Sequence, residues 1–270
     1  MELAITVATP HEHERELAAD ALWALGATAV VDDPSSRGRA VVGGFACADD
    51  ATAALAALRD RWAVAVLPAA DDSWADAWRA WAKPVTVGRL TIRPAWIDGD
   101  GIAIEPGRSF GTGSHPSTRL ALAALDRGVS PGTTVLDVGT GTGVLAIAGA
   151  VLGASRVVAI DVDAGARAVA AANVAANGCA GVVTVDHRAV GAIRGRFDVV
   201  VANLGGVLAP LAIADQLASR VAPGGALIVS GLLAPDAGGL DTRELERALG
   251  APVDRSTEGD WIALTWRDGG

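Results

Sequence analysis

The sequence has only two cysteines and one lysine among its 270 residues. It also has no apolar run approaching the roughly 20 residues of a membrane-spanning helix, and its N-terminus lacks the basic-then-apolar order of a secretory signal. Cys47 and Cys179 do not have the spacing of a metal or redox motif, so no metal site is predicted and nothing calls for an oxidising compartment. We therefore expect a cytoplasmic protein that does not associate with membranes.

Positive charge is scarce as well. Lys83 is the single lysine, and the formal net charge is −9. Such an acidic chain is a poor match for nucleic-acid phosphates, so direct nucleic-acid binding is not expected. The charge is compatible with a basic protein substrate, but many enzymes are acidic for solubility alone, and both interpretations stay open. The length allows one large domain and one small domain.

The clearest functional pattern runs from Thr134 to Asp161. It predicts strands at 135–138 and 156–160, a glycine turn at 139–143, and a helix from 144 to 152. Glycines at the first turn and an acid at the tip of the second strand are typical of a nucleoside-cofactor site. Asp161 is expected to accept hydrogen bonds from both ribose hydroxyls. A Cβ at Gly139 or Gly141 would collide with the bound nucleoside.

The glycine spacing indicates which nucleoside binds. The glycines read G-x-G-x-G instead of the dinucleotide pattern G-x-G-x-x-G, and Asp137 stands two residues before the first of them. A carboxylate at that position would repel a pyrophosphate, but it suits a cofactor that carries an ammonium and a sulfonium. We therefore predict S-adenosylmethionine (AdoMet) in preference to NAD. The alternative is a turn that merely packs the helix on the strand, and the spacing from Gly139 to Asp161 argues against it.

Residues 1–68 predict a small domain with the order β-α-β-β-α-β, which is typical of a ferredoxin-like sandwich. Strands are expected at 3–8, 27–31, 40–46 and 62–67, and helices at 12–25 and 49–61. No group of catalytic side chains occurs in this part of the sequence. A binding role is the natural hypothesis, and a purely structural role is the alternative.

Residues 69–98 predict a linker helix followed by a hairpin. Trp74, Trp78 and Trp81 fall on one face of the helix, and Pro84 ends it. This tryptophan face is expected to pack against a neighbouring domain, with an aromatic substrate clamp as the alternative. The hairpin is expected within 85–96.

A loop rich in glycine, proline and hydroxyl groups occupies residues 105–119 and precedes a helix expected at 118–125. Such a loop is free to fold over a ligand. Ser117 or Thr118 is expected to cap the helix and to offer a hydroxyl to that ligand, whereas His115 is expected to be a solvated loop histidine.

The apolar run 197–202 predicts a buried strand that ends at Asn203. Because α/β sheets bind ligands at the carboxyl ends of their strands, Asn203 is expected to hold an amine in line with a methyl group; a turn-initiating role is the alternative. Further along, helices are expected at 164–177, 211–221 and 240–249, and strands at 182–185, 226–230, 252–256 and 261–266. Five parallel strands followed by a hairpin match the seven-stranded sheet of methyltransferases.

Three motifs resemble the PrmA, or ribosomal protein L11 methyltransferase, family. They are E-P-G-x-x-F-G-T-G-x-H-x-x-T at 105–118, D-V-G-T-G-T-G-V-L-A-I-A at 137–148 and V-A-N-L at 201–204. The similarity extends from about residue 70 to E-G-D-W near the C-terminus. It implies an α/β fold in which a ferredoxin-like substrate-recognition domain (1–68) and a linker (69–98) precede a Rossmann-like AdoMet methyltransferase domain (99–270).

The resemblance also implies which residues contact AdoMet. In that family the contacts fall on Thr118, Gly139, Asp161 and Asn203. Together with the residues that the motifs add, the candidate cofactor site is Phe110, Thr112, Thr118, Asp137, Gly139, Thr140, Gly141, Asp161 and Asn203, with Asn203 as the catalytic residue. One departure concerns 205–207, which read Gly-Gly-Val where other methyltransferases clamp the target nitrogen with N-P-P-aromatic.

The expected reaction is methyl transfer to the N-terminal α-amine and/or lysine amines of ribosomal protein L11 by a monomeric enzyme. Deprotonating the amine at pH 7 costs about 4.6 kcal/mol for lysine and about 1 to 1.4 kcal/mol for an α-amine, so the α-amine is the easier target. Three alternatives stay open: a methyltransferase for another protein or a small amine, an NAD-dependent oxidoreductase, and a non-catalytic binding module.

Overall fold

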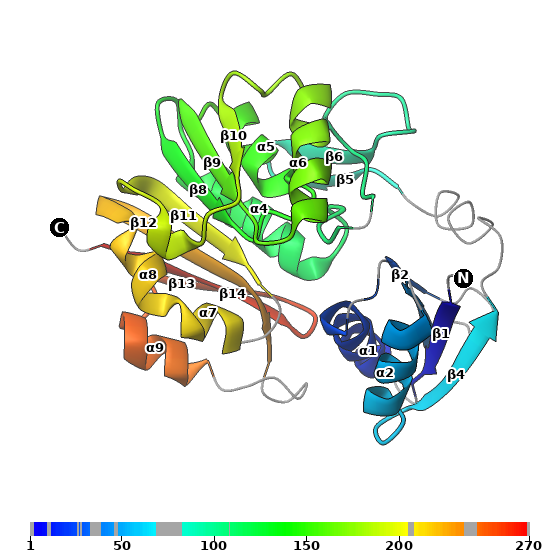
Figure 1. Cartoon of the computed structure of the whole chain (residues 1–270). Helices are drawn as coiled ribbons and strands as arrows, with labels where there is room; N and C mark the ends of the chain where they lie inside the picture. The colour runs from blue at the N-terminus through cyan, green and yellow to red at the C-terminus, as the bar shows by residue number, and fades with distance from the viewer. Residues whose placement is uncertain are drawn as a thin grey trace. The chain divides into compact units, whose positions relative to one another are not determined.

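The computed structural model describes residues 3–9, 12–25, 27, 29–32, 39–45, 48–68, 83–107, 109–204, 208–234 and 242–268. The chain divides into two compact units, residues 1–82 and 83–270 (Figure 1). The predicted tryptophan-bearing helix and the segment 205–207 lie outside the described residues. No helix of the described residues is long and apolar enough to cross a membrane.

The first unit has the predicted element order. Its elements are β1 (Leu3–Ala8), α1 (Glu12–Ala24), β2 (Ala29–Asp32), β3 (Ala40–Phe45), α2 (Ala48–Leu58) and β4 (Ala63–Pro68). The strands form an antiparallel sheet in the order β2-β3-β1-β4. The ferredoxin-like fold is thereby confirmed.

Alternating apolar residues build the core of the first unit. Ile5 and Val7 point to the same face of β1 and are fully buried with Phe45 of β3 and Leu22 of α1. A Cβ at Gly43 would lie 2.8 Å from Leu22 Cδ2, so the missing side chain lets α1 pack closely on the sheet.

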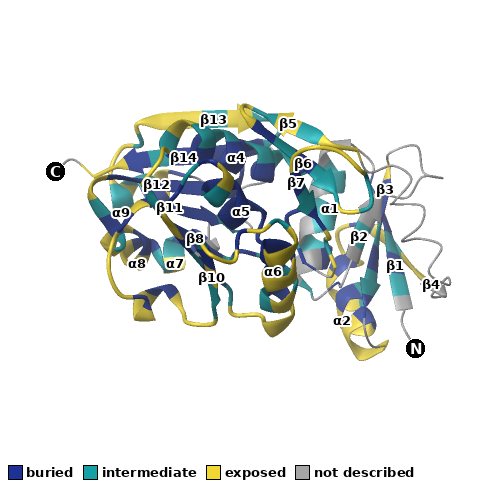
Figure 2. Ribbon diagram, turned by 90° about the horizontal axis from the view of Figure 1, so that it is seen from above, coloured by how far each residue is buried: buried dark blue, intermediate teal, exposed yellow. Residues whose placement is uncertain are grey.

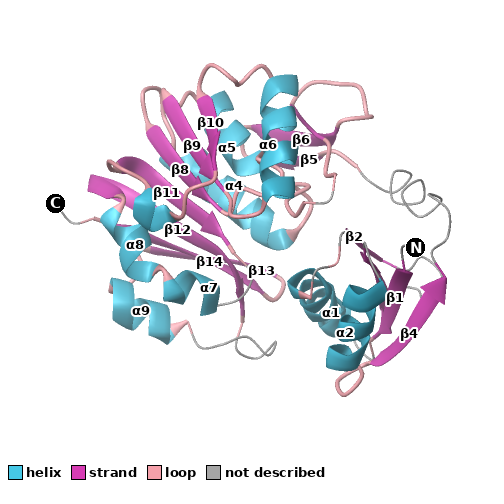
Figure 3. Cartoon of the chain, viewed as in Figure 1, coloured by secondary structure: helices cyan, strands magenta, loops and turns pink. Residues whose placement is uncertain are grey.

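The second unit contains a seven-stranded sheet in the order β10-β9-β8-β11-β12-β14-β13 (Figure 3). The strands are β8 (Thr134–Val138), β9 (Arg156–Ile160), β10 (Val183–Asp186), β11 (Phe197–Asn203), β12 (Val221–Leu233), β13 (Asp254–Glu258) and β14 (Trp261–Arg267). The first five are parallel, and the β13–β14 hairpin joins them antiparallel to β12. This arrangement confirms the predicted methyltransferase sheet.

Helices cover both faces of this sheet. They are α4 (Pro116–Gly128), α5 (Val144–Val151), α6 (Ala164–Ala176), α7 (Leu208–Ala212), α8 (Ala214–Ser219) and α9 (Arg243–Leu249), with a 3-10 turn at Val190–Ala192. Leu125 of α4 and Ile147 of α5 belong to the apolar core on one face, whereas Leu217 of α8 and Leu245 of α9 belong to the core on the other face. The sheet is therefore buried between two helical layers, as the dark central strands of Figure 2 show.

The expected hairpin within 85–96 is confirmed as β5 (Val85–Val87) and β6 (Leu90–Pro94), which pair antiparallel. A third strand that was not predicted, β7 (Ile102–Ile104), pairs parallel to β6. The single helix expected at 211–221 is wrong, because α7 and α8 are separated at Ile213, whose backbone is not helical. Val221 instead begins β12 and lies opposite Phe197, so strand pairing ends the helical segment early.

Candidate functional site

The glycine turn connects β8 to α5 at the carboxyl end of the sheet. Gly139 and Gly141 have φ values of 73° and 54°, a conformation that favours glycine. A Cβ at Gly139 would lie 2.4 Å from Leu204 Cδ2, and one at Gly141 would lie 2.4 Å from the Phe110 carbonyl oxygen. The Phe110 backbone thus requires a glycine at 141, which is a reason that the sequence did not reveal. At 139 the neighbour is the movable end of a leucine side chain, and the positive φ is what favours glycine.

The loop after β7 is fastened to this glycine turn. The backbone N–H of Thr142 donates to the Phe110 carbonyl at 3.0 Å, and Thr142 Oγ1 donates to the Gly111 carbonyl at 2.5 Å. The loop at 109–115 is therefore held against the glycine turn, and its predicted role of folding over a ligand stays a prediction.

Asp161 follows β9, and backbone groups orient its carboxylate. Oδ2 accepts a hydrogen bond from the Gly141 N–H at 3.0 Å, and Oδ1 accepts one from the Asp163 N–H at 3.0 Å. Each carboxylate oxygen retains acceptor capacity beyond one such bond. The arrangement is consistent with the predicted role toward ribose hydroxyls.

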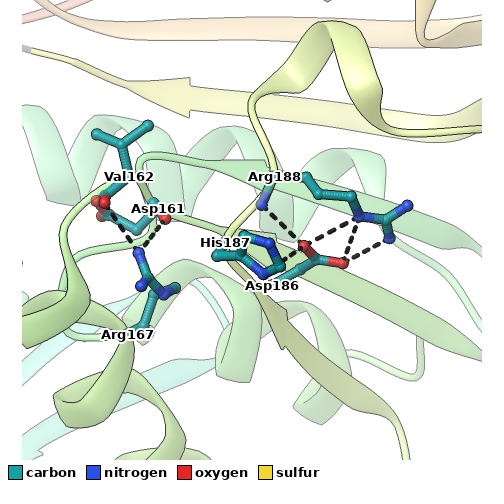
Figure 4. A network of polar contacts seen from close by, with 6 residues as sticks. All are labelled: Asp161, Val162, Arg167, Asp186, His187 and Arg188. Atoms are coloured by element: carbon teal, nitrogen blue, oxygen red, sulfur yellow. Dashed lines mark hydrogen bonds and ion pairs between the residues drawn. The ribbon is translucent and has the colours of Figure 1, made fainter.

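The segments that follow β9 and β10 lie side by side (Figure 4). Arg167 of α6 donates through one nitrogen to the carbonyls of Asp161 and Val162, at 3.0 and 2.9 Å. Arg167 thus holds the backbone that follows β9.

At the end of β10, the Asp186 carboxylate accepts hydrogen bonds from Arg188, and these bonds lower the pKa of Asp186 to about 2.

Asp137 is completely buried in β8. Its Oδ2 accepts a hydrogen bond from Thr140 Oγ1 at 2.5 Å, whereas its Oδ1 has no partner among the described residues. Burial is the main cause that raises the pKa of Asp137 to about 7; the Thr140 hydroxyl and the backbone dipole at Ala146 oppose the rise, and the nearby Asp161 adds to it. A cation beside Oδ1 would favour the ionised form.

Asn203 and Thr118 meet although they are 85 positions apart in the chain. Asn203 Nδ2 donates to Thr118 Oγ1 at 3.3 Å, and Asn203 Oδ1 is buried without a partner among the described residues. Ser230 Oγ donates to the Ser117 carbonyl at 2.8 Å, which ties the first turn of α4 to β12. The site thus joins the carboxyl ends of β11 and β12 to the start of α4.

The expectations for His115 and for the α4 cap are wrong. His115 is the N-cap: its Nδ1 accepts a hydrogen bond from the Ser117 N–H at 3.3 Å. The His115 ring is partly buried between the rings of Phe110 and Trp261, with centroid distances of 5.1 and 4.6 Å. Burial, aided by Arg119, lowers the pKa of His115 to about 4, so the ring is neutral at pH 7. Trp261 comes from a distant strand, which local sequence patterns do not place.

Hydrogen bonds join six of the nine predicted residues in pairs: Asp137 with Thr140, Gly141 with Asp161, and Thr118 with Asn203. Phe110 is bonded to Thr142 of the glycine turn, which also contains Gly139. The Thr112 hydroxyl instead bonds Ser114 Oγ at 2.9 Å within the loop. The sequence analysis missed Ser230, Leu204 and Asn173. Asn173 was detectable, because it is a polar residue on the buried face of an alanine-rich helix.

These residues fit AdoMet. Asp137 Oδ1 and Asn203 Oδ1 are unpaired buried acceptors, and buried acceptors without donors cost free energy. The ammonium of AdoMet and an incoming amine supply N–H donors, while the two positive charges of AdoMet favour the ionised form of Asp137. A pyrophosphate would supply only acceptors and negative charge.

Comparisons with known proteins identify the family of this chain. The family model "Ribosomal protein L11 methyltransferase (PrmA)" matches residues 46–268. The ribosomal protein L11 methyltransferase of Pelotomaculum thermopropionicum is 46% identical over 76% of this chain and 68% of the relative, and that of Geotalea daltonii is 44% identical over 60% and 57%. The match thus spans 57% to 68% of the length of these two relatives.

A solved structure supports the same assignment. The ribosomal protein L11 methylase from Lactobacillus delbrueckii subsp. bulgaricus superposes with a TM-score of 0.60 and 31% sequence identity, over 67% of this chain and 96% of that chain. From the extent of the family match and the identity to its members, the chain belongs to the PrmA family of ribosomal protein L11 methyltransferases.

Proposed function

We propose that this chain transfers methyl groups from AdoMet to amines of ribosomal protein L11, namely the N-terminal α-amine and/or lysine side chains. The observation that carries the proposal is the unpaired, buried Oδ1 of Asn203 at the carboxyl end of β11. A neutral amine has the N–H donor that this oxygen lacks.

The candidate residues have separate roles in this proposal. Asp161 binds the ribose hydroxyls, and Asp137 with Thr140 faces the positively charged part of the cofactor. Gly139 and Gly141 shape the turn beneath it. Phe110 and Thr112 of the loop and Thr118 of α4 close the site from the other side and exclude water.

The bound AdoMet supplies a methyl group on a sulfonium, which is a good leaving group. Asn203 accepts one N–H of the amine and so directs the nitrogen lone pair toward the methyl carbon. Bound AdoMet would supply the methyl group and a neutral thioether as the leaving group, and the methylated ammonium would give its proton to water. Thr118 accepts from Asn203 Nδ2 and thereby holds the amide in that orientation.

The proposal assigns no protein base. His115 is a weak base, with a pKa of about 4, and its Nδ1 already accepts a hydrogen bond from the Ser117 N–H. The amine must therefore arrive deprotonated, which favours an α-amine over lysine by about 3 kcal/mol at pH 7.

The ferredoxin-like part of the first unit, residues 1–68, is proposed to recognise the ribosomal protein. We propose a cytoplasmic enzyme, since ribosomal proteins are made and assembled there, and the monomeric state and the lack of nucleic-acid binding stay predictions. One observation favours a second candidate, a methyltransferase for another protein or small amine: the family model begins only at residue 46. Most of the first unit thus lies outside the match.

The test is the intact mass of recombinant ribosomal protein L11 after incubation with the full chain and AdoMet. An unrelated basic protein serves as the control. Increments of one methyl mass on L11 alone are expected. If L11 gains no mass while AdoMet still binds, the substrate proposal is wrong. Removing residues 1–68 then separates another protein from a small amine as the substrate, because a small-amine enzyme would keep its activity.

A further inference from the structure

Asn173 of α6 is buried, with 2% of its surface exposed, and its whole amide is used in hydrogen bonds. Nδ2 donates to the Glu105 carbonyl and to the Thr142 carbonyl, each at 2.9 Å. Oδ1 accepts from the Glu105 N–H at 3.0 Å. One side chain thus bonds two backbone segments that are far apart in the chain.

These two segments are the walls of the candidate site. Glu105 begins the loop that contains Phe110 and leads to Thr118, and Thr142 belongs to the glycine turn. The Phe110 carbonyl also accepts the Thr142 N–H. The Asn173 amide therefore bonds the same two segments that are also joined directly by the Thr142–Phe110 hydrogen bond.

Helix α6 packs tightly on both segments. A Cβ at Gly107 would lie 2.8 Å from Val169 Cγ2, and one at Gly143 would lie 3.3 Å from Ala170 Cα. These close approaches leave little room for either segment to shift relative to the helix. Asn173 lies on the same buried face and supplies the polar link.

One turn later, Asn177 makes a similar set of bonds to the same stretch of chain, two residues before Glu105. Its Oδ1 accepts from the Ala103 N–H at 2.9 Å, and its Nδ2 donates to the Ala103 carbonyl at 2.7 Å and to the Asn173 carbonyl at 2.8 Å. Ala103 lies in β7, and none of these bonds reaches the glycine turn. Asn177 is therefore a matched control within the molecule.

We propose that Asn173 is a positioning residue for AdoMet, because its amide sets the separation between the 105–115 loop and the glycine turn before the cofactor binds. The inference rests on the proposed function in that AdoMet is the ligand of this site. A preformed site binds its ligand more tightly, because binding does not have to include the entropic cost of ordering the two segments. Asparagine is specifically required, since two donors and one acceptor are used at once.

The test compares Asn173→Ala and Asn173→Asp with Asn177→Ala and Asn177→Asp in the full chain. Aspartate keeps the shape but puts an acceptor against the two carbonyl oxygens. We expect the Asn173 variants to raise the Kd for AdoMet at least tenfold by calorimetry, and the Asn177 variants to raise it less than threefold. Thermal unfolding identifies an Asn173 variant and an Asn177 variant that lose a similar amount of Tm. A difference in Kd between these two variants then cannot come from general destabilisation. Equal changes in Kd at equal loss of Tm would overturn the proposal.

A measurement on the unmutated chain covers the case in which the Asn173 variants do not fold. Hydrogen exchange of the Glu105 and Ala103 amides, which donate to Asn173 and Asn177, is compared with and without S-adenosylhomocysteine. We expect the ligand to slow exchange more than tenfold at Glu105 and less than threefold at Ala103. Equal slowing at both amides would contradict the positioning role.

These outcomes are separable from failure of the proposed function. If the unmutated chain binds AdoMet without methylating L11, the substrate proposal fails and the Asn173 comparison stands. If it methylates L11 and the Asn173 variants bind AdoMet normally, only the positioning role is wrong. If the unmutated chain does not bind AdoMet, both are overturned.

Discussion

The two ends of the β8–β11 strand pair differ in whether their polar side chains have hydrogen-bond partners. At the amino end, the Asp198 carboxylate accepts from the Thr134 N–H at 2.8 Å and from Thr134 Oγ1 at 2.7 Å, and the Asp198 N–H donates back to Thr134 Oγ1. At the carboxyl end, Asp137 Oδ1 and Asn203 Oδ1 are buried without partners among the described residues.

This difference shows how one pair of strands combines stability with function. The amino end satisfies its polar groups internally, and the resulting hydrogen bonds lower the pKa of Asp198. The carboxyl end leaves acceptors unpaired, which costs stability until a ligand supplies donors. The unpaired acceptors lie at the end of the strands where open α/β sheets bind their ligands.

The largest expected effect comes from removing an unpaired acceptor at the carboxyl end. Asn203→Ala should lower kcat for L11 methylation by at least about 100-fold, since the amine loses its orienting partner. The stability of the ligand-free chain should change little. Steady-state kinetics with thermal unfolding checks both. A variant that kept turnover and AdoMet affinity would remove Asn203 from the proposed mechanism.

The second effect concerns pH and Asp137. Its pKa is about 7 in the folded chain, against an ordinary value of 3.8. At a pH between these two values, the folded chain holds a proton on Asp137 that the unfolded chain has released. The contribution of Asp137 to the free energy of unfolding therefore falls as the pH rises from about 4 to 7. Above pH 7 this contribution no longer changes with pH. The steepest contribution is of the order of 1 kcal/mol per pH unit.

Denaturant unfolding of the ligand-free chain and of Asp137→Asn between pH 4 and 8 measures this contribution as the difference between the two slopes. In addition, AdoMet affinity should rise through pH 7, because a cation favours the ionised carboxylate. Identical slopes for the two chains would show that Asp137 does not titrate in this range.

A smaller effect is expected at His115, which caps α4 next to the carboxyl end of the β8–β11 strand pair. His115→Ala removes the N-cap bond to Ser117 and should cost about 1 kcal/mol of unfolding free energy. It should also weaken AdoMet binding severalfold, because Phe110 loses its ring contact. His115→Asn keeps a capping side chain and is the control: full recovery of AdoMet affinity in this variant would show that the cap matters and the ring contact does not.

The smallest effect is expected at the amino end. Asp198→Ala removes two hydrogen bonds at an exposed carboxylate and should cost at most about 1 kcal/mol of stability. AdoMet affinity and turnover should stay within twofold of the unmutated chain. A loss of activity comparable to that of Asn203→Ala would break the comparison between the two ends.

The order of elements was predictable because local patterns encode it. Strand β9 occupies the expected residues 156–160, and β11 ends at Asn203 as expected. The strand β7 was missed because its three residues are too few to show alternation. The end of α8 was misplaced because pairing of Val221 with Phe197 overrides the local helical pattern.

The sequence by itself determined the glycine turn, the acids at the ends of β8 and β9 and the asparagine at the end of β11, since these positions follow from short-range patterns. Only the tertiary structure decided that His115 caps α4 between Phe110 and Trp261, and that Asn173 bonds a residue 68 positions away. The physical reason is that such contacts depend on how helices pack on the sheet and on strand register. Local hydrophobic patterns indicate which face of a helix or strand is buried, but not which distant polar group it will contact.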